Sequence, residues 1–291
     1  MMSLEEFLAL PTEEVARLVR QAGPQVCVFP INGTRRWFVL EHGDASPDRY
    51  VPIAANEYIR LFSLLFEHGI DVILSPLFGT ELLRRGEKYV SEALGGALIL
   101  ESPGFLEFYK TWQVKVRFYG DYRLALANTP HAGLLASFDR IAEVTSHYQQ
   151  RRLFFGLFAN DAAETTARLT IEFYHKNNRI PTRRELIEAY YGEALPPATL
   201  FVGFQPPSVF DYPLLGLGEE NLYFTIAPTP YMNRDILRSI LYDHFYLRRI
   251  PEPEWFDLSA EEIQTLRDYY RTYHKEVLGL GSLFHGIWRP R

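Results

Sequence analysis

The stretch VCVFPINGTRRWF, residues 26–38, carries the strongest local signal in this chain of 291 residues. An apolar, β-prone run ends at Asn32, turns at Gly33 and then presents the adjacent cations Arg35 and Arg36. In an open parallel sheet, ligands bind outside the carboxyl ends of the strands, so this stretch predicts a binding site. Two guanidinium groups suit a diphosphate, because each planar fork makes paired charge-assisted bonds to phosphate oxygens. The segment alone leaves open that both arginines are solvated surface charge.

Six apolar runs of this kind predict the fold class. The run LFFGLF is apolar throughout, which is typical of a strand covered on both faces. Helical patterns lie between the runs, and such alternation indicates a parallel sheet. We therefore expect one α/β domain, residues 1–291, with a central, mostly parallel six-stranded sheet flanked by helices. The strands are expected near residues 26–29, 72–75, 114–119, 153–158, 200–203 and 221–226.

The helical patterns have recognisable ends. Apolar residues recur at helical spacing over residues 58–66 until Gly69, and again over residues 236–245. TRRE at 182–185 and SAEE at 259–262 match the capping box, in which a Thr or Ser and a Glu three residues later bond each other's backbone.

Composition excludes several classes of protein. The net charge is −6 with no basic block, which argues against a nucleic-acid partner. Cys27 is the single cysteine and is expected to be a buried thiol. There is no apolar run of about 18 residues and no leader-like start, so we expect no membrane span and a cytoplasmic location. The 15% aromatic content could line a long apolar cavity, although plain core packing is the simpler explanation.

Familiar catalytic motifs are missing, but polar side chains follow several predicted strands. The chain has no G-x-S-x-G, H-E-x-x-H or Walker sequence. Asn32, Asp121, Asn160 and Asp161 come after strands, which predicts a polar rim above the sheet. Each of these residues could instead simply cap the helix that follows it.

Basic residues are unevenly distributed. No Lys or Arg lies between Arg184 and Arg234, so the last two strands are approached by neutral, aromatic and proline-rich loops. A protein that binds two diphosphates needs cations at two separate places. This chain offers one convincing cationic strand end.

These residues resemble a known family. The turn after the first strand is similar to the aspartate-glycine-asparagine-glycine-arginine-tryptophan signature of cis-prenyltransferases. Ordered blocks along nearly the whole chain resemble the bacterial diterpene synthases of this type, which make tuberculosinol, tuberculosinyl adenosine and kolavelool. The blocks are residues 33–38, 65–70, 118–122, 160–164, 181–185, 190–193, 241–244 and 286–288.

The resemblance implies an enzyme that ionises a bicyclic C20 allylic diphosphate, with Mg²⁺ as cofactor, and adds water to the cation. Members of the family are usually homodimers. Residues 236–247 could form the interface, although core packing explains that helix equally well. The implied catalytic residues are Asn32, Tyr50, Arg35 and Arg36, with Gly33 and Thr34 also binding the diphosphate. The substrate pocket is expected to include Trp37, Phe78, Tyr119, Asp121, Asn160 and Asp161.

The sequence departs from the family pattern at two points. Asn32 stands where the family has the aspartate that contacts magnesium, and a neutral amide binds a hard cation less well. The span 204–231 contains no Lys or Arg, whereas chain-elongating members hold a second diphosphate there with arginines and serines. We therefore expect the chain to bind one diphosphate and not to elongate prenyl chains.

Three alternatives remain open from the sequence. Adenosine or another acceptor, rather than water, could capture the cation. The chain could also be a non-catalytic partner subunit, which the loss of the aspartate at Asn32 would fit. Tyr50 could guide the nucleophile, or it could merely pack beside Pro47 and Pro52.

Overall fold

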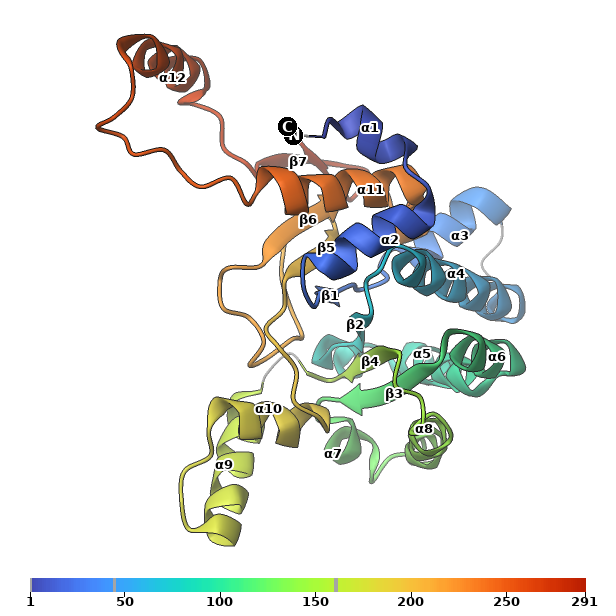
Figure 1. The fold of residues 1–291 in the computed structure, drawn as a ribbon. Coiled ribbons are helices and arrows are strands. Elements are labelled where there is room, and N and C mark those ends of the chain that lie inside the picture. Colours follow the sequence, from blue (N-terminus) through green and yellow to red (C-terminus); the bar gives the residue numbers. More distant parts are fainter. Residues whose placement is uncertain (1, 44–45, 160–161) are drawn as a thin grey trace.

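The six expected strands form one sheet in the computed structural model, which describes residues 2–43, 46–159 and 162–291. Every neighbouring pair is parallel, in the order β3-β4-β2-β1-β5-β6. Figure 1 shows this sheet in the middle of the molecule, with helices on both sides. The predicted α/β fold with a six-stranded parallel sheet is therefore confirmed. The strands are β1 (Val26–Val28), β2 (Val72–Phe78), β3 (Val114–Tyr119), β4 (Arg151–Leu157), β5 (Leu200–Phe204) and β6 (Asn221–Thr225).

Helices connect the strands and cover the sheet (Figure 1). The α-helices are α1 (Leu4–Ala9), α2 (Thr12–Gln21), α3 (Thr34–His42), α4 (Pro47–Glu67), α5 (Glu87–Gly96), α6 (Pro103–Trp112), α7 (Tyr122–Leu126), α8 (Gly133–Val144), α9 (Ala163–Asn177), α10 (Arg183–Tyr191), α11 (Arg234–Tyr242) and α12 (Ala260–Tyr273). Short 3₁₀ turns are η1 (Thr80–Arg84), η2 (Ala97–Glu101) and η3 (Thr229–Tyr231), and α11 continues into a π-helical turn, η4 (Asp243–Leu247). Among the described residues, no helix combines the length and apolar composition needed to cross a bilayer.

Both faces of the sheet are buried, which explains why its strands are apolar throughout. Cys27 and Ile73 belong to the core that α2, α4, α6 and α11 close over one face. Val28 and Leu74 belong to a second core, which includes α10 on the other face. Cys27 is fully buried, as predicted, and burial raises the pKa of its thiol far above the usual range.

The predicted helix ends are found in the structure. Both capping boxes, at 182–185 and 259–262, make their reciprocal bonds and begin α10 and α12. Gly69 follows α4 with a φ of +85°, and a Cβ there would lie 2.6 Å from the carbonyl oxygen of Ala16. Glycine is required at this position because α2 packs directly against the turn.

Residues 236–247, considered above as an interface, are largely core. Leu237 and Leu241 of α11 are buried in the same core as α1 and α4. The Arg238 guanidinium is also buried, and it donates to the carbonyl oxygens of Leu8 and Leu10. Within one chain, this helix therefore holds the N-terminal segment against the sheet.

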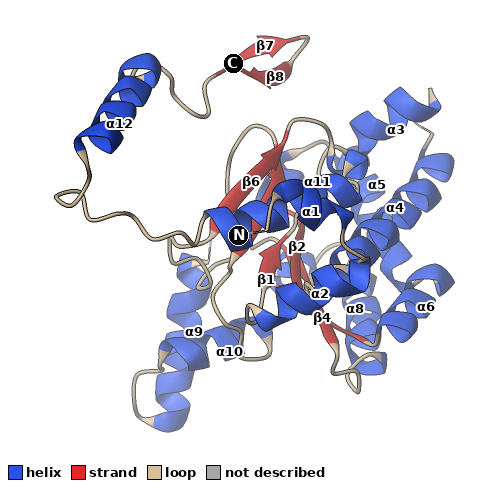
Figure 2. Cartoon of the chain, turned by 45° about the horizontal axis from the view of Figure 1, so that its top comes forward, coloured by secondary structure: helices blue, strands red, loops and turns tan. Residues whose placement is uncertain are grey.

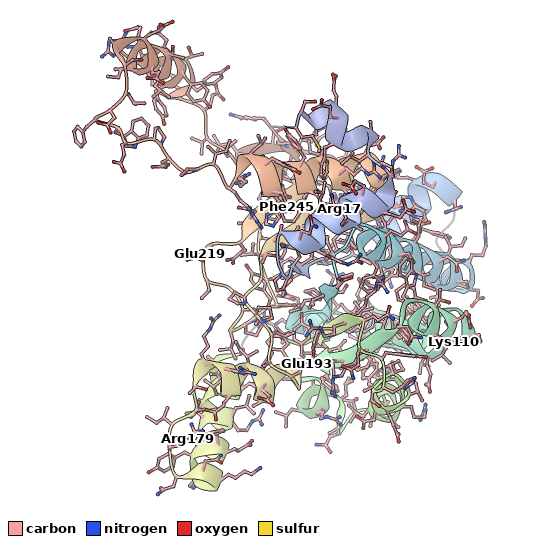
Figure 3. All side chains as sticks on the ribbon, in the orientation of Figure 1. Arg17, Lys110, Arg179, Glu193, Glu219 and Phe245 are labelled. Atoms are coloured by element: carbon pink, nitrogen blue, oxygen red, sulfur yellow. The ribbon has the colours of Figure 1, made fainter. Side chains whose placement is uncertain are left out.

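The final 43 residues, 249–291, form what we call the C-terminal arm. Figures 1 and 2 show α12 standing away from the sheet, connected to it by an extended segment. The arm ends in an antiparallel hairpin of β7 (Gly281–Phe284) and β8 (Ile287–Pro290), which the sequence did not predict. No residue of the arm is buried, and in Figure 3 α12 and its side chains stand apart from the rest of the protein.

Candidate active site

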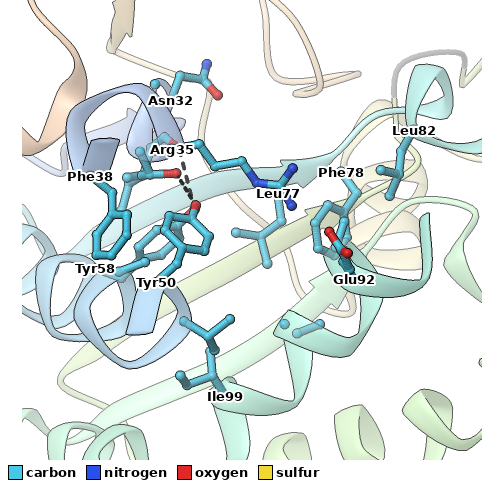
Figure 4. A pocket seen from close by; sticks show the side chains of 18 of the residues that line it. Asn32, Arg35, Phe38, Tyr50, Tyr58, Leu77, Phe78, Leu82, Glu92 and Ile99 are labelled. Atoms are coloured by element: carbon cyan, nitrogen blue, oxygen red, sulfur yellow. Dashed lines mark hydrogen bonds between the residues drawn. The ribbon is translucent and has the colours of Figure 1, made fainter. Parts of the chain in front are cut away.

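A cavity of about 720 Å³ opens beside the carboxyl ends of β1 and β2. One wall comes from α3 and α4, and the other from η1, α5 and η2. Figure 4 shows Arg35 reaching over this space, with Phe38, Tyr50 and Tyr58 gathered on one side. The polar part of the lining contains Asn32, Gly33, Thr34, Arg35, Arg36, Glu81, Arg85, Tyr89 and Glu92. The remaining lining is apolar apart from Tyr50 and Tyr58, so the cavity has a charged rim and an apolar interior.

Gly33 shapes the rim. Its φ of +75° is left-handed, and a Cβ there would lie 2.9 Å from Cβ of Pro228 and 3.0 Å from Cε1 of Phe204. Both the backbone conformation and the space therefore call for glycine. The neighbouring residue is also fixed, because the Asn32 N–H donates to Oγ1 of Thr229 and the Asn32 carbonyl accepts from the Thr229 N–H, each at 3.1 Å.

The Gly33 turn places the N-terminus of α3 at the cavity. No side chain caps this helix, and the N–H groups of Thr34, Arg35 and Arg36 have no acceptor among the residues that the structure describes. Free N–H groups at a helix N-terminus, together with the positive end of the helix dipole, form an anion site.

Three arginines add full positive charges to this rim. Arg35 and Arg85 lie on the ring of Tyr89, with Cζ 4.5 and 4.6 Å from its centroid, and Arg36 lies 5.5 Å from the ring centroid of Phe204. Within the described ranges, none of the three forms an ion pair. Their charges are therefore available to a ligand, and their convergence on one cavity favours a binding role over simple surface charge.

Tyr50 belongs to the same constellation. Its hydroxyl oxygen lies 2.6 Å from Oγ1 of Thr34, the first residue of α3. Its ring packs edge-on against Phe38, and Cζ of Arg35 lies 5.8 Å from the ring centroid. Tyr50 is thus held by packing against Phe38, and its hydroxyl faces the N-terminus of α3.

Small residues create the apolar interior. Ala54 and Ala55 of α4 line the cavity opposite Ala93 of α5 and Ala97 of η2. Five aromatic side chains line it, namely Phe38, Tyr50, Tyr58, Phe78 and Tyr89, whereas many other aromatic residues pack in the cores. Core packing therefore accounts for much of the aromatic content of this chain.

Several predicted pocket residues lie elsewhere. Phe78 lines the cavity, but Trp37 is buried against His42, with ring centroids 5.4 Å apart. Tyr119 is fully buried, and its hydroxyl donates to the Asp211 carbonyl oxygen at 2.7 Å. Asp121 accepts a bond from the Thr165 hydroxyl, beyond the edge strand β3. Tyr119 and Asp121 lie at the end of β3, and two strands, β4 and β2, stand between β3 and β1. This strand order keeps both residues away from the Gly33 turn. The predictions at Asn160 and Asp161 lie outside the described residues.

The sequence reasoning missed the wall that follows β2. Glu81 in η1, Arg85 directly after η1, and Tyr89 and Glu92 in α5 all line the cavity. The available signal was the basic group Arg84, Arg85 and Lys88, which follows the predicted strand at 72–75.

Asn32 offers limited support for a magnesium ion. Its side chain lines the cavity and supplies one neutral oxygen. Within the described part of the chain, no three His, Cys, Asp or Glu side chains gather closely enough to hold a metal. Mg²⁺ is often held by few protein ligands together with substrate phosphates and waters. The residues therefore fit an ion that a diphosphate brings, with Asn32 as a single protein ligand.

Fold and site together define the class of protein. The fold is similar to that of lavandulyl diphosphate synthase from Lavandula x intermedia, with a TM-score of 0.65 over 80% of this chain and 98% of that one, at 13% identity. It is also similar to a probable undecaprenyl diphosphate synthase from Campylobacter jejuni, with a TM-score of 0.56 over 79% and 98% of the chains, at 12% identity. The chain therefore has the cis-prenyltransferase fold.

Sequence comparison narrows this class to a family. The chain is 46% identical to tuberculosinyl adenosine transferase from Mycobacterium tuberculosis, over 99% of this chain and 98% of the relative. It is 26% identical to (+)-kolavelool synthase from Herpetosiphon aurantiacus, over 99% and 96% of the two chains. No protein-family model matches the chain. The chain belongs to the cis-prenyltransferase-like family of bacterial diterpene enzymes that includes these two relatives.

Proposed function

We propose that this protein is a diterpene synthase that ionises a bicyclic C20 allylic diphosphate of the kolavenyl or tuberculosinyl type. Water then captures the cation to give a tertiary alcohol such as kolavelool, and diphosphate is released. The observation that carries the proposal is the meeting of three unpaired arginines and a free helix N-terminus, among the described residues, at the rim of an apolar cavity. Its volume of about 720 Å³ lies within the range usual for small-molecule pockets.

Ionisation breaks the carbon–oxygen bond, and both electrons leave with the diphosphate. Negative charge then grows on the leaving group, where Arg35, Arg36, Arg85 and the N–H groups of α3 are available to stabilise it. Fixed donors aimed at developing charge make a large contribution to catalysis, because they need no reorganisation during the reaction.

The hydrocarbon cation would form in the apolar interior. The ring faces of Tyr50, Tyr58 and Phe78 can stabilise it by cation–π attraction and exclude competing nucleophiles. One water held near Tyr50 adds to the tertiary carbon, and its proton passes to the released diphosphate. Burial raises the pKa of Tyr58 far above neutral, so that phenol stays protonated and serves as a neutral wall.

We expect the chain to bind a single diphosphate. Phe204 and Pro228 press against the Gly33 turn, and the span 204–231 has no Lys or Arg. A second diphosphate on that side would meet no cation from this span, so the proposal does not include chain elongation.

Product analysis tests the proposal directly. The purified chain is incubated with bicyclic C20 diphosphates, with and without adenosine, and the products are identified by mass spectrometry. We expect the same diterpene alcohol in both reactions. An adenosine adduct would instead support a transferase, the activity named for the 46% identical relative. Absence of turnover by the chain alone would support a partner-subunit role. We also expect the active form to be a homodimer.

The change Asn32→Asp tests the proposed magnesium contact. A carboxylate should bind the diphosphate-borne ion more tightly, so the Mg²⁺ concentration for half-maximal rate should fall by about tenfold. Without added Mg²⁺ the variant should be slower than the wild type, because its new charge repels the diphosphate. Asn32→Ala is the control, since it removes the amide oxygen without adding charge. An identical Mg²⁺ dependence in all three proteins would show that residue 32 does not contact the ion.

The change Tyr50→Phe tests the role of the hydroxyl that contacts Thr34. We expect the rate of alcohol formation to fall by about tenfold, the equivalent of one hydrogen bond, with more hydrocarbon formed by proton loss. Tyr58→Phe is the matched control, because Tyr58 lines the same cavity but makes only a long contact of 3.4 Å to the Ile31 carbonyl. The measurement is the ratio of alcohol to hydrocarbon. Equal ratios in both variants would leave Tyr50 with a packing role alone.

A further inference from the structure

A short segment after β6 supports the Gly33 turn from outside the cavity. Residues 228–232, which we call the clamp, contain the 3₁₀ turn η3 and are buried except for Tyr231. None of these residues lines the cavity. The clamp therefore has no contact with a ligand in the cavity, and any influence on such a ligand passes through the residues that the clamp holds.

Thr229 of the clamp forms a reciprocal pair of hydrogen bonds with Asn32. The Asn32 N–H donates to Oγ1 of Thr229, and the Thr229 N–H donates to the Asn32 carbonyl oxygen, each at 3.1 Å. Pro228 limits the turn from the same side, because a Cβ at Gly33 would lie only 2.9 Å from Cβ of Pro228. Since α3 begins directly after Gly33, these contacts fix the direction in which the free N–H groups of α3 point.

Arg60 fastens the clamp to α4. Its Nη2 donates to the Pro230 carbonyl oxygen at 2.7 Å, and its Nη1 donates to the Met232 carbonyl oxygen at 3.0 Å. A bond of 2.7 Å from its Nε to Glu57 holds the guanidinium in this orientation. The same helix carries Ala54, which lines the apolar interior of the cavity. Arg60 thus connects the helix that shapes the interior with the segment that holds the anion site.

A second threonine grips the other end of the same stretch of chain. The Thr199 N–H donates to the Val26 carbonyl oxygen at 2.9 Å, and the Val26 N–H donates to Oγ1 of Thr199 at 3.1 Å. The Thr199 hydroxyl also lies 3.2 Å from the Val26 carbonyl oxygen. Val26 begins β1, so this pair lies at the amino end of the sheet, whereas the cavity lies at the carboxyl end. Residues 26–32 are therefore held at both ends by the same reciprocal bonds, and only one end is at the site.

We infer that Thr229 and Arg60 are positioning residues for the reaction proposed above, on which this inference rests. Thr229 holds the Gly33 turn so that the N–H groups of α3 point at the charge that develops on the diphosphate. Arg60 keeps that turn at a fixed place relative to the apolar wall of α4. Donors of this kind stabilise developing charge only while they are held in place, and a displacement of about 1 Å costs about 10²-fold in rate.

The experiment uses the full-length chain and four variants. Thr229→Val keeps the shape of the side chain and removes the hydroxyl, so the Asn32 N–H loses its acceptor. Thr229→Ser keeps the hydroxyl and should restore most of the activity. Thr199→Val is the matched control, because it removes the same acceptor at the amino end of β1. Arg60→Lys keeps the positive charge but loses the planar fork that reaches two carbonyl oxygens.

Three quantities are measured, namely kcat and KM for the C20 diphosphate, Kd for inorganic diphosphate, and the melting temperature. Thr229→Val and Thr199→Val should both lower the melting temperature by about 2–4 °C, because each leaves a backbone N–H without its acceptor. Thr229→Val alone of these two should lower kcat, by at least about tenfold, and raise the Kd of inorganic diphosphate by about fivefold. KM should change less than kcat, because the hydrocarbon still contributes its binding energy. Arg60→Lys should lower kcat by about fivefold.

Several results would overturn the inference. They are a wild-type Kd and kcat in Thr229→Val, equal losses in Thr229→Val and Thr199→Val, or a Thr229→Ser variant as impaired as Thr229→Val. Wild-type constants in Arg60→Lys would overturn the role of Arg60.

The binding of inorganic diphosphate separates this inference from the proposed function. A wild type that binds inorganic diphosphate but turns over no C20 diphosphate would contradict the proposed function, and the Kd values of the variants would then decide the inference alone. A wild type that binds no diphosphate would contradict both.

Discussion

Replacing Arg35 and Arg36 together by alanine should lower kcat/KM for the C20 diphosphate by at least about 10³-fold. Removing one donor from a developing oxyanion commonly costs about 10²-fold or more, and this change removes two full charges from the rim of the cavity. The α3 N–H groups and Arg85 remain, so some ionisation should persist. Steady-state kinetics measure the effect, and a thermal melt establishes that the variant is folded.

The control for this prediction is Arg17→Ala/Lys110→Ala. Both side chains are exposed (Figure 3), each pairs with a glutamate on its own helix, and neither lines the cavity. The control loses the same total charge, so it accounts for any general electrostatic attraction of the substrate. If both double variants kept kcat/KM within a few-fold of the wild type, Arg35 and Arg36 would be solvated surface charge after all.

The change Ala54→Phe should abolish most turnover of the C20 substrate while leaving diphosphate binding intact. Ala54 is buried in α4 and lines the apolar interior, so a phenyl ring there occupies the space proposed for the hydrocarbon. Displacement of the reacting carbon by about 1 Å is enough to cost about 10²-fold in rate. The measurements are kcat/KM for the C20 diphosphate and the inhibition constant of inorganic diphosphate, which we expect to stay unchanged.

Ala127→Phe is the matched control for this change, because Ala127 is exposed at the end of α7. It should leave both constants unchanged. A parallel loss of turnover and of diphosphate inhibition in Ala54→Phe would mean that the ring disturbs the anion site, and the interior would then not be the hydrocarbon site.

The strands were predictable because a sheet buried on both faces needs continuous apolar runs, and those runs are visible locally. The end of β2 was harder to predict. Residues 72–75 were predicted, whereas the strand continues to Phe78 through Pro76. Proline cannot donate a ladder bond and normally argues against a strand interior, yet here the register shifts between Pro76 and Phe78. That local adjustment depends on the neighbouring strand and leaves no trace in the sequence.

The anion site was partly predictable for a similar reason. Gly33, Arg35 and Arg36 are adjacent in sequence, so their chemistry could be inferred before their geometry. Arg85 directly follows η1, about fifty residues after Arg35, and only the fold brings it to the same rim. Asp121 was expected at the pocket because it follows a strand, but it lies beyond the edge strand β3. All strand ends share one edge of the sheet, and the order of the strands decides how far apart they lie.

The separation between the Gly33 turn and the alanines of α4 and α5 has an evolutionary consequence. In the proposed reaction, cleavage of the carbon–oxygen bond depends on the Gly33 turn and a few cations, whereas the carbon skeleton that fits depends on the small side chains of α4 and α5. Mutations at the alanines can therefore alter product identity without rebuilding the machinery for bond cleavage. Such a layout lets a lineage diversify its terpenoids through single nucleotide changes. It also makes the alanines that line the cavity the natural target for engineering new skeletons.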